Sequence, residues 1–327
     1  MKNFANVDAR NVEEAVRLLQ EGRQESRSVS LAAGGSDLLG MIKDDLVAPD
    51  VLVNLKPIEG LRAVTTIADG VRVGGLITLN SLAEHPRILA DYTVLAEAAG
   101  SVGTPQIRNV GTLAGNICQR PWCWYLRAGF PCFKNGGDMC FSWIGENQFN
   151  AIFGGGPSYI VHPSDTAPAL VALDARFHIV GPAGERAVPA SEFFILPQTD
   201  VSRENVLDSD EMVTQVEIPA APSGTKSRYA KVLDREAWTH AVVSAAVVLR
   251  MQDGICRGAR VVLGGVAPIP WRLPEVEAML RGQRITKELA ARAGRQAVSG
   301  AEPLSKNAYK IPMTENLLRR TLLELAG

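Results

Sequence analysis

The chain lacks the features of several common protein classes. No apolar run reaches the roughly 18 residues that a membrane-spanning helix needs, and residues 1–10 contain no apolar signal-peptide core. The formal net charge is −1, which gives no support for nucleic-acid binding, since that usually requires a basic face. We therefore expect no membrane span and no nucleic-acid partner. We expect a cytoplasmic protein, or a periplasmic one exported with a partner that carries the signal.

Motifs for familiar catalytic chemistry are also missing. The sequence contains neither a Walker A loop nor a G-x-G-x-x-G dinucleotide fingerprint. No Ser-His-Asp or paired-carboxylate arrangement stands out. The five cysteines are an odd number in a chain of 327 residues, which argues against a disulfide framework. We therefore assign no catalytic residue from the sequence.

The composition is that of a globular protein with hydrophobic cores, at 46% hydrophobic and 21% charged residues. The length predicts about two to three domains. Residue spacing predicts helices at 12–19, 88–102, 167–172, 271–279, 286–297 and 313–325, and strands at 51–55, 64–67, 71–73, 176–180, 213–218, 241–251 and 257–263. Asn11 and Glu14 form a capping-box pattern. The proline-rich break at 219–224 indicates a domain boundary.

Two glycine-bearing loops are candidate ligand sites. The first, at 31–39, contains Gly34 and Gly35, which permit positive φ and close backbone approach to a ligand. Its free amides, with the Ser36 hydroxyl, are suited to a pyrophosphate. The second, at 111–116, has small and short polar residues that suit a backbone packed on a flat ligand. The first loop alone favours a plain strand-turn-helix, and the second alone is equally consistent with a buried turn, but two such loops in one chain favour a cofactor.

Four of the five cysteines follow the second loop directly, at Cys118, Cys123, Cys132 and Cys140. Thiolates are the preferred ligands of iron–sulfur clusters and of structural zinc. The intervening stretches of four, eight and seven residues fit zinc poorly, because zinc sites favour C-x2-C pairs. An iron–sulfur cluster, structural zinc and no metal all remain open. Cys256 lies far away and is expected to be a buried small hydrophobe.

Five segments together resemble one known family. They are 33–39, 109–116, 162–170, 229–235 and 264–272. The first two resemble the flavin loops, and the other three resemble later segments, of the FAD-binding subunits of molybdenum hydroxylases, the xanthine dehydrogenase family. The resemblance covers nearly the whole chain.

This resemblance implies an α+β fold with a vanillyl-alcohol-oxidase-type, two-part FAD-binding domain. The parts would be a first subdomain at 1–57 and a second at 58–222, with a cysteine-rich insert at about 117–158. A C-terminal α+β domain, with a three-stranded sheet and helices, would occupy 223–327.

The resemblance also implies the cofactor-binding residues. They are Ala33, Gly34, Gly35, Ser36, Asp37, Leu38, Thr104, Asn109, Gly111, Thr112, Ala114, Gly115, Asn116, Asp165 and Lys231. Asp165 either receives a hydrogen bond from the flavin or only caps the helix that follows. Lys231 and Arg235 either polarise the reduced flavin or pair with Asp234 and Glu236, and the residues favour the second interpretation. For His162 we favour a role in loop packing over metal binding.

The cysteine insert resembles those of 4-hydroxybenzoyl-CoA reductase and of bacterial aldehyde oxidoreductases, whose flavoprotein subunits hold an additional 4Fe-4S cluster. Cys123, Cys132 and Cys140 match three family ligands, whereas the fourth family position is Ser158 here. Either Cys118 supplies the fourth thiolate instead, or the cluster has a serine ligand, is incomplete or is lost. We assign all four cysteines as metal ligands, and we predict that Cys118→Ser lowers cluster content while Ser158→Ala does not.

The implied function is electron transfer within a heterotrimeric molybdenum hydroxylase. FAD would receive electrons from 2Fe-2S clusters on a small partner subunit, which a molybdenum cofactor on a large molybdopterin-binding subunit supplies. An external acceptor would then take them. Aldehyde oxidation is the expected reaction of the complex, with an aromatic acyl-CoA dehydroxylating reductase as the alternative. A stand-alone flavin oxidase and a metal-stabilised scaffold protein are the other hypotheses.

Overall fold

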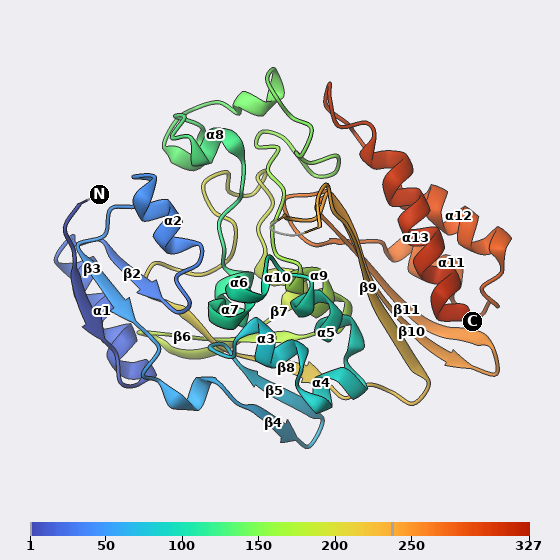
Figure 1. Ribbon diagram of the computed structural model, residues 1–327, viewed down its shortest axis with the longest axis horizontal. Coiled ribbons are helices and arrows are strands. Elements are labelled where there is room, and N and C mark those ends of the chain that lie inside the picture. The colour runs from blue at the N-terminus through green and yellow to red at the C-terminus, as the bar shows by residue number, and fades with distance from the viewer. Residues whose placement is uncertain (1, 237–238) are drawn as a thin grey trace.

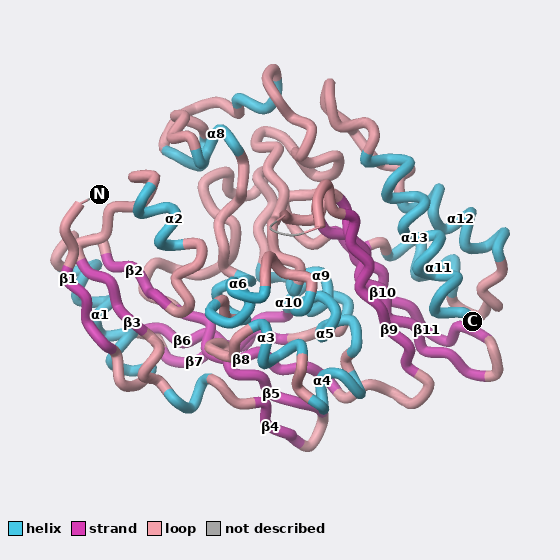
Figure 2. Tube along the Cα trace, in the orientation of Figure 1, coloured by secondary structure: helices cyan, strands magenta, loops and turns pink. Residues whose placement is uncertain are grey.

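The computed structural model describes residues 2–236 and 239–327. Three β-sheets follow one another from the N-terminus to the C-terminus, and a segment made mostly of loops rises above the central one (Figures 1 and 2). Within these residues, no helix combines the length and apolarity that crossing a membrane requires.

The strands and helices have the following bounds. The strands are β1 (Ala5–Asp8), β2 (Val29–Ala32), β3 (Val51–Asn54), β4 (Val64–Ile67), β5 (Gly70–Gly74), β6 (Arg176–Gly181), β7 (Gly184–Pro189), β8 (Met212–Pro219), β9 (Thr225–Val232), β10 (Val243–Gln252), β11 (Ile255–Gly264) and β12 (Trp271–Arg272). The α-helices are α1 (Val12–Gln24), α2 (Leu38–Lys43), α3 (Leu79–Ala83), α4 (Pro86–Asp91), α5 (Thr93–Gly100), α6 (Pro105–Val110), α7 (Leu113–Ile117), α8 (Trp124–Arg127), α9 (Thr166–Ala172), α10 (Ala190–Phe193), α11 (Pro274–Leu280), α12 (Lys287–Ala297) and α13 (Lys310–Ala326).

The first sheet is parallel, with the order β1-β3-β2. Helix α1 begins after Asn11, whose side chain accepts a hydrogen bond from the Glu14 N–H at 2.8 Å. The Glu14 carboxylate in turn accepts from the Arg10 N–H, so Asn11 satisfies a free helix donor and Glu14 binds the residue before the cap. The strand β2 ends directly before the first glycine loop, which the sheet therefore holds in place.

The central sheet is antiparallel, with the order β4-β5-β8-β6-β7. Strand β8 pairs with β5 on one side and with β6 on the other. Because β5 is distant from β8 in sequence, the sheet is complete only after β8 has been added. Helices α3, α5, α7 and α9 cover one face of the sheet (Figure 1). Their apolar side chains form the main core with the strands, including fully buried Leu82, Tyr92, Leu170 and Phe177. The second glycine loop leads into α7, and the loop before α9 contains Asp165.

The C-terminal sheet has four strands, in the antiparallel order β12-β11-β10-β9. The expectation of three strands was therefore wrong. The additional strand is the short β12, in which Trp271 and Arg272 pair with the end of β11. The helix predicted at 271–279 begins only at Pro274, because proline is favoured in the first helical turn, where no N–H bond is needed. Helices α11, α12 and α13 cover the outer face of this sheet (Figure 1).

The cysteine insert is mostly irregular, with the short helix α8 and two 3-10 turns at Phe133–Asn135 and Phe141–Trp143. Its end is tied to the C-terminal domain by Lys310, which is fully buried. The Lys310 ammonium donates to the carbonyl oxygens of Phe149, Asn150 and Gly265, at 2.9, 3.0 and 2.7 Å. These carbonyl groups lie outside helices and strands. The buried lysine supplies the hydrogen bonds that water cannot reach them to provide.

Candidate functional site

A cavity of about 550 Å³ lies where the two glycine loops, the cysteine insert and the segment before β10 meet. A volume of this size is typical of a site for a cofactor or small molecule. Of the predicted cofactor-binding residues, seven line it, namely Ser36, Asp37, Gly111, Thr112, Gly115, Asn116 and Asp165. The two loops, which lie far apart in the sequence, therefore bound one cavity.

The first loop is pressed against the second. A Cβ atom added at Gly34 would lie 2.0 Å from the Val110 carbonyl oxygen, so no side chain fits there. Gly35 has φ +72, a conformation that favours glycine. Both glycines thus shape the contact between the loops, and they place Ser36 and Asp37 at the cavity.

The second loop is built on two successive helix caps. The Thr104 hydroxyl accepts from the Ile107 N–H at 3.4 Å, and the Thr112 hydroxyl accepts from the Gly115 N–H at 3.2 Å. Threonine caps fix the entry of the chain into α6 and α7 because they satisfy amides that have no partner within the helix. Thr112 is itself at the cavity, whereas Thr104 supports the loop from outside it.

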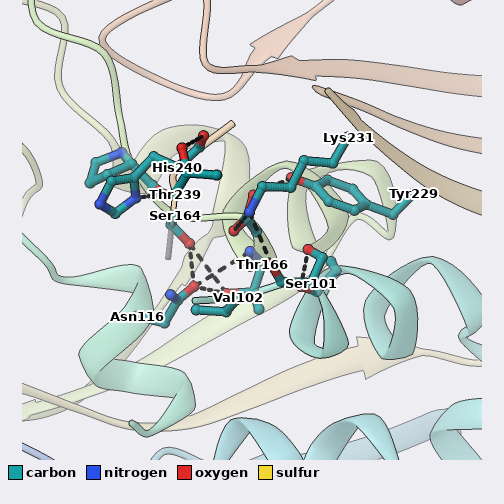
Figure 3. A network of polar contacts seen from close by, with 12 residues as sticks. Ser101, Val102, Asn116, Ser164, Thr166, Tyr229, Lys231, Thr239 and His240 are labelled. Atoms are coloured by element: carbon teal, nitrogen blue, oxygen red, sulfur yellow. Dashed lines mark hydrogen bonds and ion pairs between the residues drawn. The ribbon is translucent and has the colours of Figure 1, made fainter. Parts of the chain in front are cut away.

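Asn116 joins the second loop to the segment before α9 (Figure 3). Its side-chain oxygen accepts hydrogen bonds from the Ser164 hydroxyl at 2.6 Å and the Thr166 hydroxyl at 2.7 Å. All three residues are buried. The two segments are therefore held in fixed positions on either side of Asp165.

Asp165 is the centre of a buried polar network with Tyr229 and Lys231, both of which are labelled in Figure 3. One carboxylate oxygen accepts from the Tyr229 hydroxyl at 2.6 Å, and the other accepts from the Lys231 ammonium at 2.7 Å. The Lys231 ammonium also donates to the Ser101 carbonyl oxygen at 3.0 Å. Burial, together with the neighbouring Asp165 charge, raises the pKa of Tyr229 well above its usual value. This network fixes the carboxylate at the wall of the cavity.

Two expectations for this network need correction. The Asp165 side chain makes no helix-capping hydrogen bond, because Tyr229 and Lys231 occupy both of its oxygens. Lys231 does not pair with Asp234 or Glu236, as the residues alone favoured, but with Asp165. The side chain of Lys231 is on the buried face of strand β9, which turns it away from its neighbours in sequence.

The cysteines do not form one group. Cys123, Cys132 and Cys140 line a second, small cavity of about 10 Å³ together with the buried Ser158. Cys118, at the end of α7, does not line this cavity and packs against the central core instead. Burial there raises the pKa of the Cys118 thiol to about 12. Cys118 thus lies outside the small cavity that the other three cysteines share, and its assignment as a metal ligand stays a prediction.

Within residues 2–236 and 239–327, no three or more His, Cys, Asp or Glu side chains are arranged to hold a single metal ion. Burial raises the pKa of the Cys123 thiol, while the backbone N–H groups of Tyr125 and Leu126 at the start of α8 oppose that rise. Cys123 also lines the larger cavity, so this residue borders both.

Comparison with known proteins identifies the family. Residues 2–221 match the family described as the FAD binding domain in molybdopterin dehydrogenase, and residues 228–325 match the CO dehydrogenase flavoprotein C-terminal domain. The chain belongs to the FAD-binding medium subunits of the molybdenum hydroxylase family.

Relatives of this family are similar over almost their full length. The aldehyde oxidoreductase FAD-binding subunit PaoB of Escherichia coli (strain K12) is 33% identical over 89% of this chain and 90% of its own. The carbon monoxide dehydrogenase medium chain of Hydrogenophaga pseudoflava is 29% identical over 96% of this chain and 93% of its own. A solved carbon monoxide dehydrogenase from Hydrogenophaga pseudoflava, which lacks the Mo-pyranopterin moiety of the molybdenum cofactor, superimposes with a TM-score of 0.78 at 28% identity, covering 99% of this chain and 97% of that chain.

Eight further residues that the family resemblance implied do not line the large cavity in the part of the chain described. They are Ala33, Gly34, Gly35, Leu38, Thr104, Asn109, Ala114 and Lys231. Three of them support the cavity from behind: Gly34 through the loop contact, Thr104 through its helix cap and Lys231 through its ion pair with Asp165. Asn109 is exposed on α6, and no observation connects it with the cavity.

Sequence reasoning missed several residues that line or support the large cavity. Trp122, Arg127, Phe149 and His240 line the cavity, and no motif in the sequence marks them. Tyr229 had a usable signal, because residues two apart on a strand share a face and Lys231 was already a candidate. The others come together only through the path of the insert.

His162 has the packing role that we favoured. Its ring meets Phe194 edge to face, with centroids 4.7 Å apart, and its Nδ1 accepts from the Ser164 N–H at 3.3 Å. Burial lowers the pKa of His162 to about 3, so the ring is neutral in the folded chain at ordinary pH.

This shift predicts acid sensitivity. Below pH 6.5 the unfolded chain binds a proton at His162 that the folded chain refuses, so stability falls as the pH decreases. We expect this residue to account for a loss of ~2 kcal/mol between pH 7.5 and 5. Urea unfolding of the wild type and of His162→Gln at several pH values measures it. The acid loss should be smaller in the variant by that amount, and parallel pH curves would contradict the prediction.

Proposed function

We propose that this chain is the FAD-binding electron-transfer subunit of a molybdenum-containing dehydrogenase complex, and that the cavity of about 550 Å³ holds the FAD. The observation that carries the proposal is that both glycine loops and Asp165 border this one cavity. The residues fit the cofactor, because Ser36 of the first loop and Thr112 and Gly115 of the second bring short polar side chains and a glycine backbone to the same cavity. Bound FAD would supply one- and two-electron transfer, which no side chain here provides.

The residues of this chain would bind and orient the cofactor. The first loop offers backbone amides and the Ser36 hydroxyl for the phosphates. The loop around Thr112 and Gly115 offers a small-residue surface for a flat ring. Asp165, fixed by Tyr229 and Lys231, supplies a carboxylate that accepts hydrogen bonds from the flavin or its ribityl chain.

We further propose that the flavin binds in the vanillyl-alcohol-oxidase manner, between a subdomain at 1–57 and a second at 58–222, with 223–327 as the C-terminal domain. Two features support this. The parallel first sheet and the antiparallel central sheet each have their own core, and the loops that leave them meet at the cavity.

For the complex, we propose a large molybdopterin-binding subunit and a small 2Fe-2S subunit as partners, and an aldehyde as the substrate class. The similarity to medium chains of carbon monoxide dehydrogenase supports the heterotrimer. The 33% identity to an aldehyde oxidoreductase FAD-binding subunit supports the aldehyde.

An absorption spectrum of the gently purified chain tests the central proposal. We expect a yellow protein with flavin bands and about one FAD released per chain on denaturation. Protein that is folded by circular dichroism yet takes up no FAD from solution would refute the proposal. Co-purification of the two partner subunits tests the assembly separately from the cofactor.

For the insert, we propose iron–sulfur binding by Cys123, Cys132 and Cys140, with Ser158 as the nearest fourth donor. The donor set fits this chemistry, because three thiols and a buried hydroxyl border one space. The space fits less well: about 10 Å³ holds roughly one water molecule, so the segments must move apart to admit a 4Fe-4S cluster. The backbone amides that point at Cys123 would stabilise a thiolate there.

This assignment reverses the earlier expectation for the fourth ligand. Cys123→Ser should abolish bound iron, and Ser158→Ala should lower it, whereas Cys118→Ser should leave it unchanged because that thiol faces the core. Iron, sulfide and zinc analysis of anaerobically reconstituted chains measures the outcome, with Cys256→Ser as the matched cysteine control. Equal metal content in the wild type and Cys123→Ser would refute the proposal. Zinc in place of iron would show a structural zinc site and no iron–sulfur cluster.

A further inference from the structure

One wall of the large cavity comes from the cysteine insert. The aromatic side chains of Trp122, Trp124 and Phe149 line the cavity, yet they are 41%, 53% and 37% exposed. These rings are therefore open to the cavity or its surroundings and are not packed into a core. Trp124 and Phe149, from the beginning and the end of the insert, meet edge to face with centroids 5.5 Å apart. The insert thus contributes an aromatic rim to the cavity.

Arg127 fastens this wall to the first glycine loop. Its guanidinium lies 2.8 Å from one Asp37 carboxylate oxygen, and both side chains are largely buried, at 11% and 18% exposure. The other Asp37 oxygen accepts from the Arg120 N–H at 3.0 Å. The same guanidinium donates to the carbonyl oxygens of Pro121 and Arg120, each at 2.9 Å. Both oxygens of a residue at the cavity are therefore engaged by the insert.

Contacts of Arg127 also extend, through Trp122, to the segment before β10. Its guanidinium carbon stands 4.3 Å from the centroid of the Trp122 ring, a cation–π contact. The Trp122 ring in turn packs 5.2 Å from the His240 ring, on the segment before β10. Asp37, Arg127, Trp122 and His240 thus form a continuous chain of contacts along one side of the cavity, and all four line it.

We propose that Arg127 positions the segment 119–150 as a fixed wall of the flavin cavity, and that this wall selects among external electron acceptors by size. The inference rests on the proposed flavin in this cavity. Arg127 is a positioning residue, since it acts through Asp37 and Trp122. A small acceptor passes the aromatic rim, and a large planar one is kept from the flavin while the ion pair holds.

The test compares two acceptors with one bound flavin. The FAD-loaded full chain is reduced with dithionite and mixed in stopped flow with dioxygen, or anaerobically with dichlorophenolindophenol. Each acceptor takes two electrons and two protons from the reduced flavin, to give hydrogen peroxide or the leuco dye. In Arg127→Gln we expect the dye rate to rise about tenfold, the effect of ~1.4 kcal/mol on opening the wall. The dioxygen rate should change less than about threefold, because a small acceptor is not excluded.

Three variants separate positioning from general destabilisation. Arg127→Lys keeps the charge but loses the planar fork, so its rate ratio should lie between those of the wild type and Arg127→Gln. Trp122→Ala removes the rim ring and leaves the ion pair, and it should also raise the dye rate. Arg186→Gln breaks the comparable pair with Glu211, at 2.8 and 2.7 Å, whose members do not line the cavity, and should leave the ratio unchanged.

A readout without flavin completes the test. Amide hydrogen exchange in the flavin-free chain should increase at 120–127 in Arg127→Gln and stay as in the wild type in Arg186→Gln. If Arg127→Gln does not fold, Trp122→Ala decides the question. A dye-to-dioxygen ratio unchanged in Trp122→Ala and Arg127→Gln overturns the inference. A wild-type chain that binds no flavin refutes the proposed function instead.

Discussion

Gly34→Ala is expected to weaken FAD binding by about 100-fold, since a displacement of about 1 Å at a binding site can cost that much. The added Cβ would lie 2.0 Å from the Val110 carbonyl oxygen and 2.9 Å from the Gly111 Cα. Both contacts are to backbone, so no side chain can rotate away to relieve them. The two loops must separate, and with them the Ser36 and Thr112 walls of the cavity. Fluorescence titration of the apo chain with FAD measures the effect.

Gly40→Ala is the matched control for this change. Gly40 lies in α2, a few residues after the same loop, and a Cβ there meets no atom within 4 Å. Alanine is favoured over glycine inside a helix, so this variant should bind FAD normally and be slightly more stable. If Gly34→Ala keeps the wild-type affinity while remaining folded, the contact between the loops does not shape the cofactor site.

Removal of the Asp165 carboxylate should be the most destabilising single change at the site. In Asp165→Ala the Lys231 ammonium remains only 4% exposed, with one carbonyl oxygen as its partner. An uncompensated buried charge of this kind costs about 3–5 kcal/mol. The Tyr229 hydroxyl loses its acceptor as well. Urea unfolding should show a much lower midpoint for the variant than for the wild type.

Two further variants test that explanation. Asp174 pairs with Arg260 at the surface, where the side chains are 49% and 33% exposed, so Asp174→Asn should cost less than about 1 kcal/mol. The double change Asp165→Asn with Lys231→Met removes both charges and should recover much of the lost stability. A double variant as unstable as Asp165→Ala would show that lost packing, rather than the unpaired charge, causes the effect.

Local patterns in the sequence predicted many elements with good bounds. The helix expected at 167–172 is α9 (Thr166–Ala172), and the strand expected at 213–218 is β8 (Met212–Pro219). The sequence did not reveal that β8 pairs between β5 and β6, because strand order depends on which apolar faces pack together. The region 88–102 was expected as one helix, but it divides at Tyr92, whose fully buried side chain joins the central core.

The candidate site shows the same division. Glycines at 34, 35 and 111 could be recognised because their backbone freedom is a property of the residue itself. The partner of Lys231 could not be recognised from the sequence, because Asp165 is brought to Lys231 by the packing of α9 against the C-terminal sheet. Nearness in sequence favoured Asp234 as that partner, and the structure contradicts it.

The sequence by itself determined which chemical groups are present: two loops with free amides, a cluster of thiols, and motifs of a flavin-binding family. These are local properties, set by residue types a few positions apart. Only the tertiary structure decided which groups meet. Asp37 joins Arg127 across 90 positions, and Asp165 joins Lys231 across 66, because buried charges need partners and the packing of three sheets determines which partner is within reach.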